Sequence, residues 1–255
     1  MQLVDTHCHI HSKDYPVHVS EIFSEAQKAN VDKLICVGTD LEDSKLAIEF
    51  VEKHKNTWAS IGIHPHEANK YNDNKLLKDQ FSKLISSNKV VAVGECGLDY
   101  FYNHSPKSVQ VELLEFQLDL ATINNLPVIF HVRNAFNDFW PILDRYPTIK
   151  GVVHSFTDNE KNLIEAIKRG LFIGVNGIST FAKNLDQIEV YKHIPLSHLL
   201  LETDSPYLTP APFRGMICEP KHIKTIADFI VNLRGESLEI LANQTTKNAE
   251  ILFKI

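Results

Sequence analysis

Short apolar runs alternate with amphipathic stretches along the whole chain, and this alternation constrains the fold more than any other feature. The runs at 90–93 and 199–201 are continuously apolar, as expected for strands of a parallel sheet buried on both faces. Between such runs, apolar residues recur every three or four positions, which predicts helices. The predicted strands are residues 3–9, 33–38, 58–64, 89–95, 127–131, 150–154, 171–175 and 199–204.

Helices are predicted between these strands and after the last one. They are centred on residues 19–29, 46–51, 76–85, 113–123, 136–143, 162–169, 185–191, 223–233 and 238–253. Eight strand and helix units in strict order predict an α/β fold, a single (β/α)8 TIM-type barrel with parallel strands and an extra C-terminal helix. The length of 255 residues suits one such barrel, which typically has about 250. We find no linker, so one domain is expected over residues 1–255, with the proline-rich segment 203–220 as a barrel-top loop.

Composition and charge narrow the class of protein. Hydrophobic residues make up 44% and charged residues 23%, which is ordinary for a globular chain. The net charge of −6 argues against a broad basic surface that neutralises many phosphates. The absence of a basic leader and of a long uncharged apolar run predicts a cytoplasmic protein without a membrane segment. Four widely spaced cysteines indicate reduced thiols rather than a disulfide framework or a thiolate zinc site.

Titratable side chains fall at the carboxyl ends of the predicted strands. In the first strand His7 and His9 are two residues apart, so they point the same way, while Cys8 faces the other side as a small apolar filler. A surface histidine pair would look the same in isolation, but further strands end in the same way. These ends carry His64, Glu95, His131, His154 and Asp204. A TIM barrel gathers these ends on one face, where enzymes of this fold have their active sites.

The number of these residues indicates more than one metal ion. A catalytic zinc ion typically takes three protein ligands, so even with His64 set aside the other four imidazoles and the two carboxylates imply two divalent ions. Glu95 is expected to bridge the ions, because its strand lies between the paired histidines and the His131 and His154 strands in barrel order. Two bridged ions can activate one water for attack, so the predicted reaction class is hydrolysis. Asp204 is expected to stay ionised and to act as a general base, or else to serve only as a ligand.

Six segments, in this order along the whole chain, resemble those of the TatD-type deoxyribonucleases, which are metal-dependent members of the amidohydrolase-like barrels. The segments are VDTHCH at 4–9, GIHPH at 62–66, GECGLDY at 94–100, LPVIFHVR at 126–133, HSFT at 154–157 and LETDSPYL at 201–208. The resemblance implies a nuclease that trims single-stranded DNA from the 3′ end. The sequence shows no sign of an obligate protein partner. The resemblance also implies two divalent ions, with Mg, Mn and Zn as the candidates. The implied ligands are His7, His9, Glu95, His131, His154 and Asp204.

The chain departs from the family pattern in the barrel-top loop. Met216 and Cys218 stand where the family usually has lysine and asparagine, and Asn176 stands where serine is frequent. The two loop departures put the grip on substrate in doubt and leave the metal ligands intact.

Residues near the predicted mouth are candidates for substrate contact. His64, Arg133 and Arg214 are expected to contact phosphates, with Lys183 as a further cation. For His64 the alternative is a solvated loop residue without a substrate contact. For Arg133 we favour slightly the alternative that it pairs with a carboxylate behind the ligands. The aromatic residues 100–102 either stack on bases or cap the barrel end.

Other polar residues have structural or surface interpretations. Glu202 should share the strand face of Asp204 and orient a ligand histidine, and His66 should be structural. Seven further histidines are expected at the surface: His11, His18, His54, His104, His193, His198 and His222.

Two other functions remain open at this point. The same metal pair could hydrolyse a lactone, an amide or an ester. Alternatively, the chain could be a binding protein whose catalytic site is a relic. The phosphate-binding candidates favour a nuclease over the first alternative, and the intact ligand set argues against the second.

Overall fold

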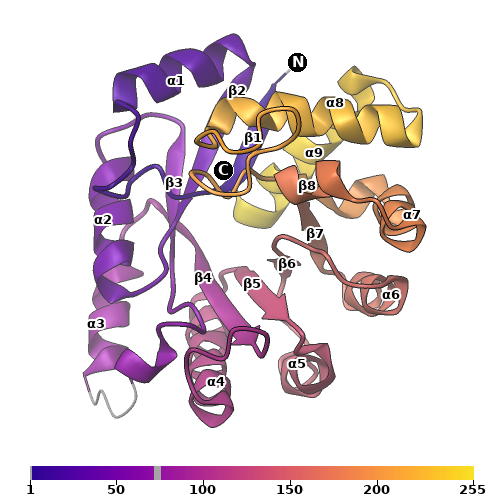
Figure 1. Ribbon diagram of the computed structural model, residues 1–255. Helices are drawn as coiled ribbons and strands as arrows, with labels where there is room; N and C mark the ends of the chain where they lie inside the picture. The colour runs from indigo at the N-terminus through magenta and orange to yellow at the C-terminus, as the bar shows by residue number, and fades with distance from the viewer. Residues whose placement is uncertain (1, 72–75) are drawn as a thin grey trace. The chain divides into compact units, whose positions relative to one another are not determined.

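The computed structural model describes residues 2–71 and 76–255 (Figure 1). The chain divides into two compact units. Unit 1 consists of Met1–Cys36 and Ser155–Ile255, and unit 2 of Val37–His154. Within the described residues, no helix is both long enough and apolar enough to span a membrane. The prediction of one domain over residues 1–255 stays a prediction.

Unit 1 contains the first and the last strands of the chain. Strand β1 (Leu3–Cys8) pairs in parallel with β2 (Val31–Val37), and β7 (Phe172–Val175) pairs in parallel with β8 (Leu199–Leu201). A parallel bridge between Cys8 and Ser205 joins the end of β1 to the segment that follows β8. The helices of unit 1 are α1 (Val19–Lys28), α6 (Glu160–Lys168), α7 (Leu185–His193), α8 (Ile223–Arg234) and α9 (Leu238–Phe253), with short 3-10 turns at Gly177–Phe181, Leu196–His198 and Pro220–His222.

Unit 2 contains four consecutive parallel strands. They are β3 (Thr57–Ile61), β4 (Val90–Asp99), β5 (Val128–Arg133) and β6 (Gly151–Val153), each paired with the next. The helices are α2 (Leu41–Val51), α3 (Leu77–Leu84), α4 (Lys107–Asn124) and α5 (Phe136–Leu143), with a 3-10 turn at Ala68–Lys70.

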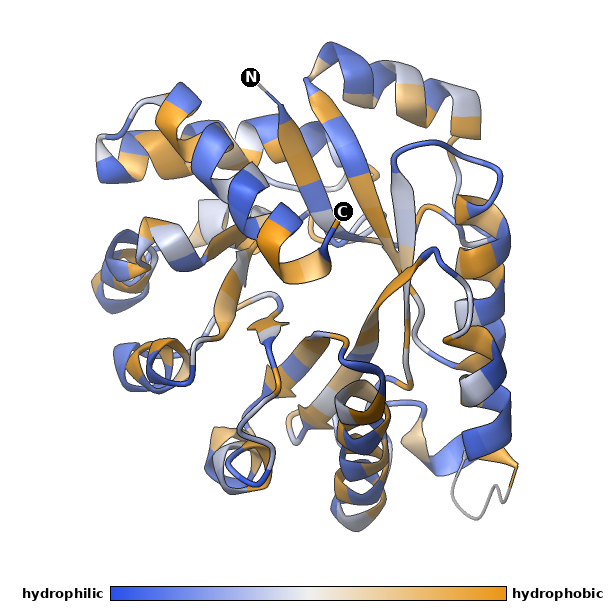
Figure 2. Cartoon of the chain, turned by 180° about the vertical axis from the view of Figure 1, so that it is seen from behind, coloured by the Kyte–Doolittle hydropathy of each residue, from blue (hydrophilic) through white to orange (hydrophobic). Residues whose placement is uncertain are grey.

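Strand burial and helix capping explain why these elements form. All ten residues of β4 are buried, as are all six of β1, so both strands require continuous apolar or internally bonded sequence. Figure 2 shows the result, with hydrophobic stretches along the strands and hydrophobic stripes on the helices. Helices begin where a side chain accepts the first free N–H groups, for example Asp40 before α2, Asn159 before α6 and Ser237 before α9.

The strand and helix alternation is confirmed, but several strand ends differ from the prediction, and two of these differences concern site residues. Helix α5 has the predicted bounds, Phe136–Leu143. Strand β4 continues past Glu95 to Asp99, because β5 offers backbone partners as far as the pair Asp99 and Arg133. Strand β8 ends at Leu201, so Asp204 lies in the following loop. The prediction that Glu95 and Asp204 end their strands is therefore wrong.

Candidate metal centre

His7, His9 and Asp204 in unit 1 form one group of possible metal ligands, which we call the β1 triad. The Nε2 atoms of His7 and His9 lie 3.2 Å apart, which confirms that the two rings point the same way. Oδ1 of Asp204 lies 3.2 Å from Nε2 of His9 and 3.5 Å from Nε2 of His7. His7 is fully buried, while the other two side chains remain slightly exposed, at 11% and 15%. Solvent therefore reaches the β1 triad through His9 and Asp204 and not through His7.

Backbone bonds fix the β1 triad in place. The Asp204 N–H donates to the carbonyl of His7 over 2.8 Å, and the His9 N–H donates to the carbonyl of Ser205 over 2.7 Å. Asp204 has a left-handed φ of 59°, which turns the chain sharply after β8. The loop is thus tied to β1 residue by residue, and this backbone geometry sets the position of the carboxylate.

Asp5, two residues before His7 in β1, supports this arrangement and was not predicted as a site residue. Its carboxyl group accepts the Thr203 N–H over 2.9 Å and the Thr203 hydroxyl over 2.6 Å. Burial raises the pKa of Asp5 to about 8, against the opposing effect of these hydrogen bonds. The signal in the sequence was an acidic residue within an apolar strand, which is rare without a buried partner.

Glu95, His131 and His154 in unit 2 form a second group, which we call the β4 triad. Oε1 of Glu95 lies 2.8 Å from Nδ1 of His131 and 3.2 Å from Nε2 of His154. The three ligand atoms lie within 4.8 Å of one another. His131 belongs to β5, and His154 directly follows β6. Adjacent parallel strands therefore bring together three of the predicted ligands.

Asp99 orients the β4 triad from behind, and sequence analysis missed it. Its Oδ2 lies 3.0 Å from Nε2 of His131 and 2.9 Å from Nε2 of His66, while its Oδ1 accepts the N–H groups of residues 101 and 102. Burial alone would raise the pKa of Asp99, but the hydrogen bonds with His131, the Tyr102 N–H and His66 hold it below its usual range. As an acceptor only, Asp99 holds the proton of His131 on Nε2, which leaves Nδ1 to act as a ligand.

Burial and the hydrogen bonds to Asp99 and Glu95 also determine the pKa of His131. Burial lowers the pKa of His131, but the hydrogen bonds to Asp99 and Glu95 outweigh this effect and raise the pKa above its ordinary value. The ring is therefore held between two carboxylates. His66 pairs with Asp99, as expected for a structural histidine.

His64 faces Glu95 as a hydrogen-bond donor. Nδ1 of His64 accepts the backbone N–H of His66 over 3.1 Å, so the neutral ring carries its proton on Nε2. Nε2 lies 3.5 Å from Oε1 of Glu95. Burial, reinforced by the nearby His131, lowers the pKa of His64 well below its ordinary value. With its proton on Nε2, His64 is better suited to donate a hydrogen bond to a phosphate than to bind a metal ion.

The spacing of both triads fits a divalent ion. Ligand atoms around a tetrahedral ion at 2.0 to 2.1 Å lie about 3.4 Å from one another. The contacts within the β1 triad are 3.2 to 3.5 Å, and those measured from Glu95 in the β4 triad are 2.8 and 3.2 Å. Each triad offers two imidazole nitrogens and one carboxylate oxygen, a mixed set that suits zinc or manganese.

Three of the predicted substrate residues, Arg133, Arg214 and Lys183, lie at exposed positions, whereas the side chain of His64 is only 13% exposed. The guanidinium group of Arg133 lies over the rings of Phe101 and Tyr102, at 4.3 and 4.7 Å from their centroids. The structure therefore places aromatic rings against Arg133 where the sequence slightly favoured a carboxylate. Arg214 is exposed and lies 5.2 Å from the centroid of Phe181, while Lys183 is exposed as well.

The two loop departures have different environments. Met216 is 62% exposed, so its side chain changes the surface of the loop. Cys218 is fully buried, with its thiol 3.9 Å from the Thr203 carbonyl and its own carbonyl accepting the Tyr15 hydroxyl over 2.7 Å. Cys218 therefore belongs to the interior of the loop rather than to its surface.

The predictions for two histidines and for Glu202 need correction or refinement. His11 and His222 are buried, at 6% and 5% exposure, so their expected surface positions are wrong. Glu202 follows the end of β8, so strand alternation does not place it on the face of Asp204. Its carboxylate accepts the Ser155 N–H over 2.6 Å and lies within 4.8 Å of a ligand atom of His7, so its role in orienting a ligand histidine stays a prediction. All four cysteines are free and buried, as the reduced state predicts.

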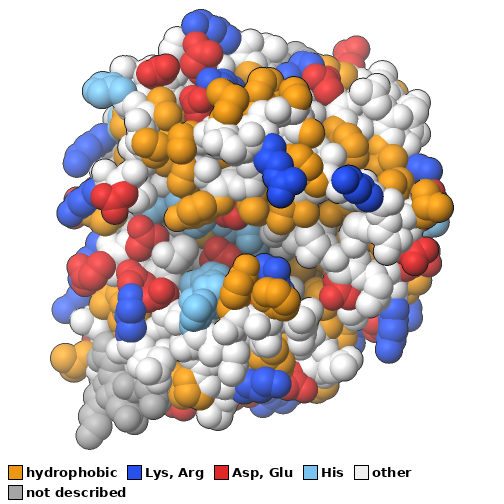
Figure 3. Space-filling view, viewed as in Figure 1, with side chains coloured by type: hydrophobic (Ala, Val, Ile, Leu, Met, Phe, Trp, Pro, Cys, Tyr) orange, Lys and Arg blue, Asp and Glu red, His pale blue; other side chains and the backbone are white. Residues whose placement is uncertain are grey.

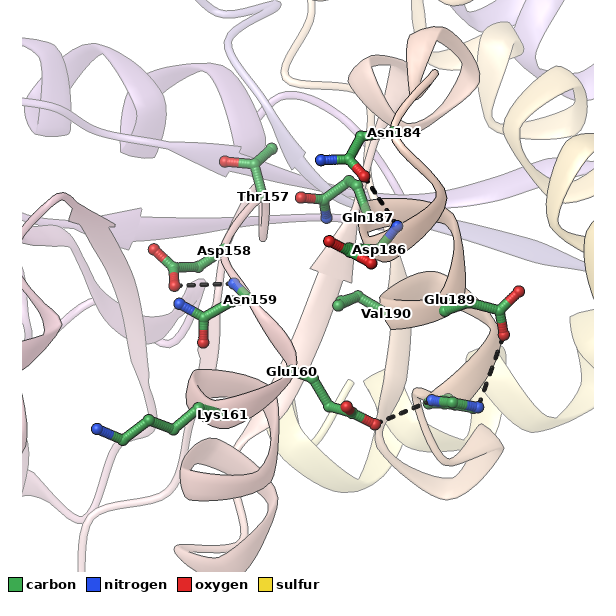
Figure 4. A pocket seen from close by; sticks show the side chains of 11 residues that line it. Thr157, Asp158, Asn159, Glu160, Lys161, Asn184, Asp186, Gln187, Glu189 and Val190 are labelled. Atoms are coloured by element: carbon green, nitrogen blue, oxygen red, sulfur yellow. Dashed lines mark hydrogen bonds and ion pairs between the residues drawn. The ribbon is translucent and has the colours of Figure 1, made fainter.

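A separate pocket of about 860 Å³ lies in unit 1 beside the start of α6 and along α7 (Figure 4). Four acidic side chains and one lysine are among its lining residues: Asp158, Glu160, Asp186, Glu189 and Lys161. This excess of carboxylates opposes phosphate binding. None of the predicted site residues lines the pocket.

Comparison with known proteins relates the chain to one family. The profile described as TatD related DNase matches residues 4–254. The chain is 36% identical to the uncharacterized metal-dependent hydrolase YabD of Bacillus subtilis, over 99% of both chains. It is also 31% identical to the 3′-5′ ssDNA/RNA exonuclease TatD of Pectobacterium carotovorum, over 99% of this chain and all of that one.

Solved structures establish the fold. The crystal structure of YJJV, a TatD homologue from Escherichia coli K12, matches with a TM-score of 0.92 and 30% identity over 99% of this chain and 98% of that one. The described residues contain eight parallel strands in chain order, alternating with helices, as in this relative. The predicted TIM-type barrel with an extra C-terminal helix is thus confirmed. The chain therefore belongs to the TatD-related DNase family and is a metal-dependent hydrolase.

Proposed function

We propose that the chain is a deoxyribonuclease that hydrolyses the phosphodiester bonds of DNA, as a 3′ to 5′ exonuclease on single strands. The observation that carries this proposal is the pair of triads, each made of two imidazoles and a carboxylate at ligand spacing. The relative named as a 3′-5′ ssDNA/RNA exonuclease supports the choice of substrate. We further propose a cytoplasmic location and no obligate protein partner, consistent with four free thiols.

In this proposal each triad holds one divalent ion, for which Mg, Mn and Zn are the candidates. His7, His9 and Asp204 would hold one ion, and Glu95, His131 and His154 the other. When bound, such ions supply positive charge to the phosphate and lower the pKa of a coordinated water. Asp99 keeps the β4 triad ready by holding Nδ1 of His131 free of its proton.

Asp204 is the proposed general base. Its carboxylate lies beside two imidazoles and keeps 15% of its surface exposed, so it can both ligate and accept a proton from an attacking water. Glu95 is proposed as the second catalytic carboxylate. His64, Arg133 and Arg214 would contact phosphates, His64 through its Nε2 proton.

Two alternatives have weaker support. Hydrolysis of a lactone, an amide or an ester would use the same triads, but it gives no role to the neutral donor His64 and the exposed Arg214. A relic without catalysis would not be expected to keep all six ligand residues at ligand spacing.

Digestion of end-labelled DNA tests the proposal. Purified protein with Mn²⁺ should shorten single-stranded DNA from the 3′ end and should cleave duplex DNA more slowly. Addition of a chelator should stop both reactions. Simple carboxylic esters and lactones serve as competing substrates. Turnover of these substrates without any cleavage of DNA would support the first alternative, and loss of all activity at full metal content would support the relic.

The variant Asp204→Asn tests the assignment of the base. It keeps the shape and one ligand oxygen, so metal content and DNA binding should persist while turnover falls by about two to four orders of magnitude. Asp186→Asn, at an exposed position on α7, is the matched control and should keep the parent's turnover. If Asp204→Asn keeps turnover within a few-fold of the parent, Asp204 is only a ligand.

A further inference from the structure

Tyr207 is an exposed aromatic residue beside the β1 triad, and none of the roles described above uses it. Its side chain is 62% exposed, and its ring centroid lies 6.3 Å from that of His9. Its backbone N–H donates to the carbonyl of Asp204 over 2.9 Å, so the ring stands one turn after the proposed base. A single exposed tyrosine on a protein surface needs no explanation, but Tyr207 lies next to possible metal ligands.

The loop that carries Tyr207 is held firmly within unit 1. The loop is tied to β1 before Tyr207 by the backbone bonds of Asp204 and Ser205, and the Cys218 N–H donates to the Pro206 carbonyl over 3.1 Å. Further along, the Thr209 hydroxyl donates to the carbonyl of Met216 over 2.6 Å. The ring is thus exposed although its backbone is fixed, which lowers the entropy cost of binding against it.

The rest of the loop is apolar at its surface rather than basic. Phe213, Met216 and Ile217 are 36%, 62% and 42% exposed. Arg214 is the only cation between residues 205 and 219. Hydrophobic side chains accordingly reach the surface on the face seen in Figure 3. Such a loop offers flat and apolar contacts to a substrate and few charges to its phosphates.

We propose that Tyr207 is a stacking platform for the nucleobase attached to the phosphate at the β1 triad. This inference rests on the proposed nuclease function and names the feature of the substrate that is recognised. Stacking of a base on an aromatic ring is worth about 1 to 3 kcal/mol and tolerates any base. A base within a duplex is already paired and stacked, so the platform would favour strands with a free terminal base.

Paired substrates and variants separate this inference from the proposed function. Two single-stranded oligonucleotides of the same length carry either thymidine or an abasic residue at the digested end, and the initial rate of release of this end is measured with Mn²⁺. The parent should prefer the thymidine end by about 5- to 150-fold, which corresponds to 1 to 3 kcal/mol. In Tyr207→Ala this ratio should fall to near one, while Tyr207→Phe should keep most of it.

Two further variants complete the test. Tyr207→Leu keeps apolar bulk without an aromatic face and should also lose the ratio, which covers the case in which the alanine variant does not fold. Ile251→Ala, at 59% exposure on α9, is a control that removes a comparably exposed apolar side chain and should keep the ratio.

The possible results point to different conclusions. If the parent cleaves neither oligonucleotide, the nuclease function itself fails. Cleavage of both ends at equal rates leaves the nuclease function intact and overturns the platform. A preference that persists in both Tyr207→Ala and Tyr207→Leu also overturns the assignment to Tyr207.

Discussion

Replacing Asp99 by asparagine tests how the β4 triad is prepared for metal. Oδ1 of Asp99 accepts two backbone N–H groups, at 3.0 and 2.9 Å, and the asparagine oxygen must take over this place. The amide NH2 group then faces Nε2 of His131 and Nε2 of His66, where the carboxylate now accepts. A donor at this position requires Nε2 of His131 to become an acceptor, which moves the ring proton to the ligand atom Nδ1.

The expected cost follows from this proton. Changes to the partner behind a ligand histidine typically lower metal affinity by about 10- to 100-fold, or about 1.4 to 2.7 kcal/mol. Calorimetric titration of metal-free protein with Zn²⁺ or Mn²⁺ should show one of two binding events weakened by this factor in Asp99→Asn. Asp79→Asn, an exposed residue of α3 in the same unit, should bind metal like the parent. Affinity of the folded Asp99→Asn variant within about threefold of the parent would refute the assigned role of Asp99.

Three further predictions address packing, salt and pH. A Cβ at Gly97, where φ is 154°, would overlap the His131 carbonyl. Gly97→Ala should therefore lower the free energy of unfolding, measured by chemical denaturation, by about 3 kcal/mol or more. Gly170→Ala, whose Cβ would have no neighbour within 4 Å, should lower it by about 1 kcal/mol. Because the chain has a net charge of −6, the affinity for single-stranded DNA should fall only slightly as the salt concentration rises. A slope of log affinity against log salt that corresponds to about eight or more neutralised phosphates would reveal an unrecognised basic groove. Burial and, to a smaller extent, the charge of Lys221 lower the pKa of His222. As the pH falls through 6.5, the ordinary histidine pKa, the unfolded state therefore takes up a proton before the folded state does, and the protein loses stability. His222→Asn should flatten this loss in denaturation curves at several pH values, and an unchanged slope would contradict it.

The sequence predicted the order of elements and pointed to candidate ligands that lie together within each unit, because both depend on local pattern. Continuous apolar runs mark buried parallel strands, and two-residue spacing places His7 and His9 on one side. Helix α5 was predicted with its final bounds, since its apolar spacing is complete within eight residues.

Features decided by distant contacts were predicted less well. The end of β4 depends on pairing with β5 as far as Arg133, which residues 95–99 alone do not reveal. The same error hid Asp99, because a strand ending at Glu95 leaves Asp99 in a loop. Burial of His222 depends on packing of the 3-10 turn Pro220–His222 against the preceding loop, where its ring centroid lies 5.2 Å from that of Phe213. Single histidines carry no periodic signal that separates surface from interior.

The most direct test of the metal centre combines metal content with turnover. Metal-free protein is reconstituted with Mn²⁺ or Zn²⁺, the bound ions are counted by elemental analysis after gel filtration, and hydrolysis of single-stranded DNA is measured on the same samples. We expect activity to rise with binding, to be complete at two ions per chain, and to disappear in chelator. Full activity in chelator, with fewer than one transition-metal ion per chain after reconstitution, would contradict the account.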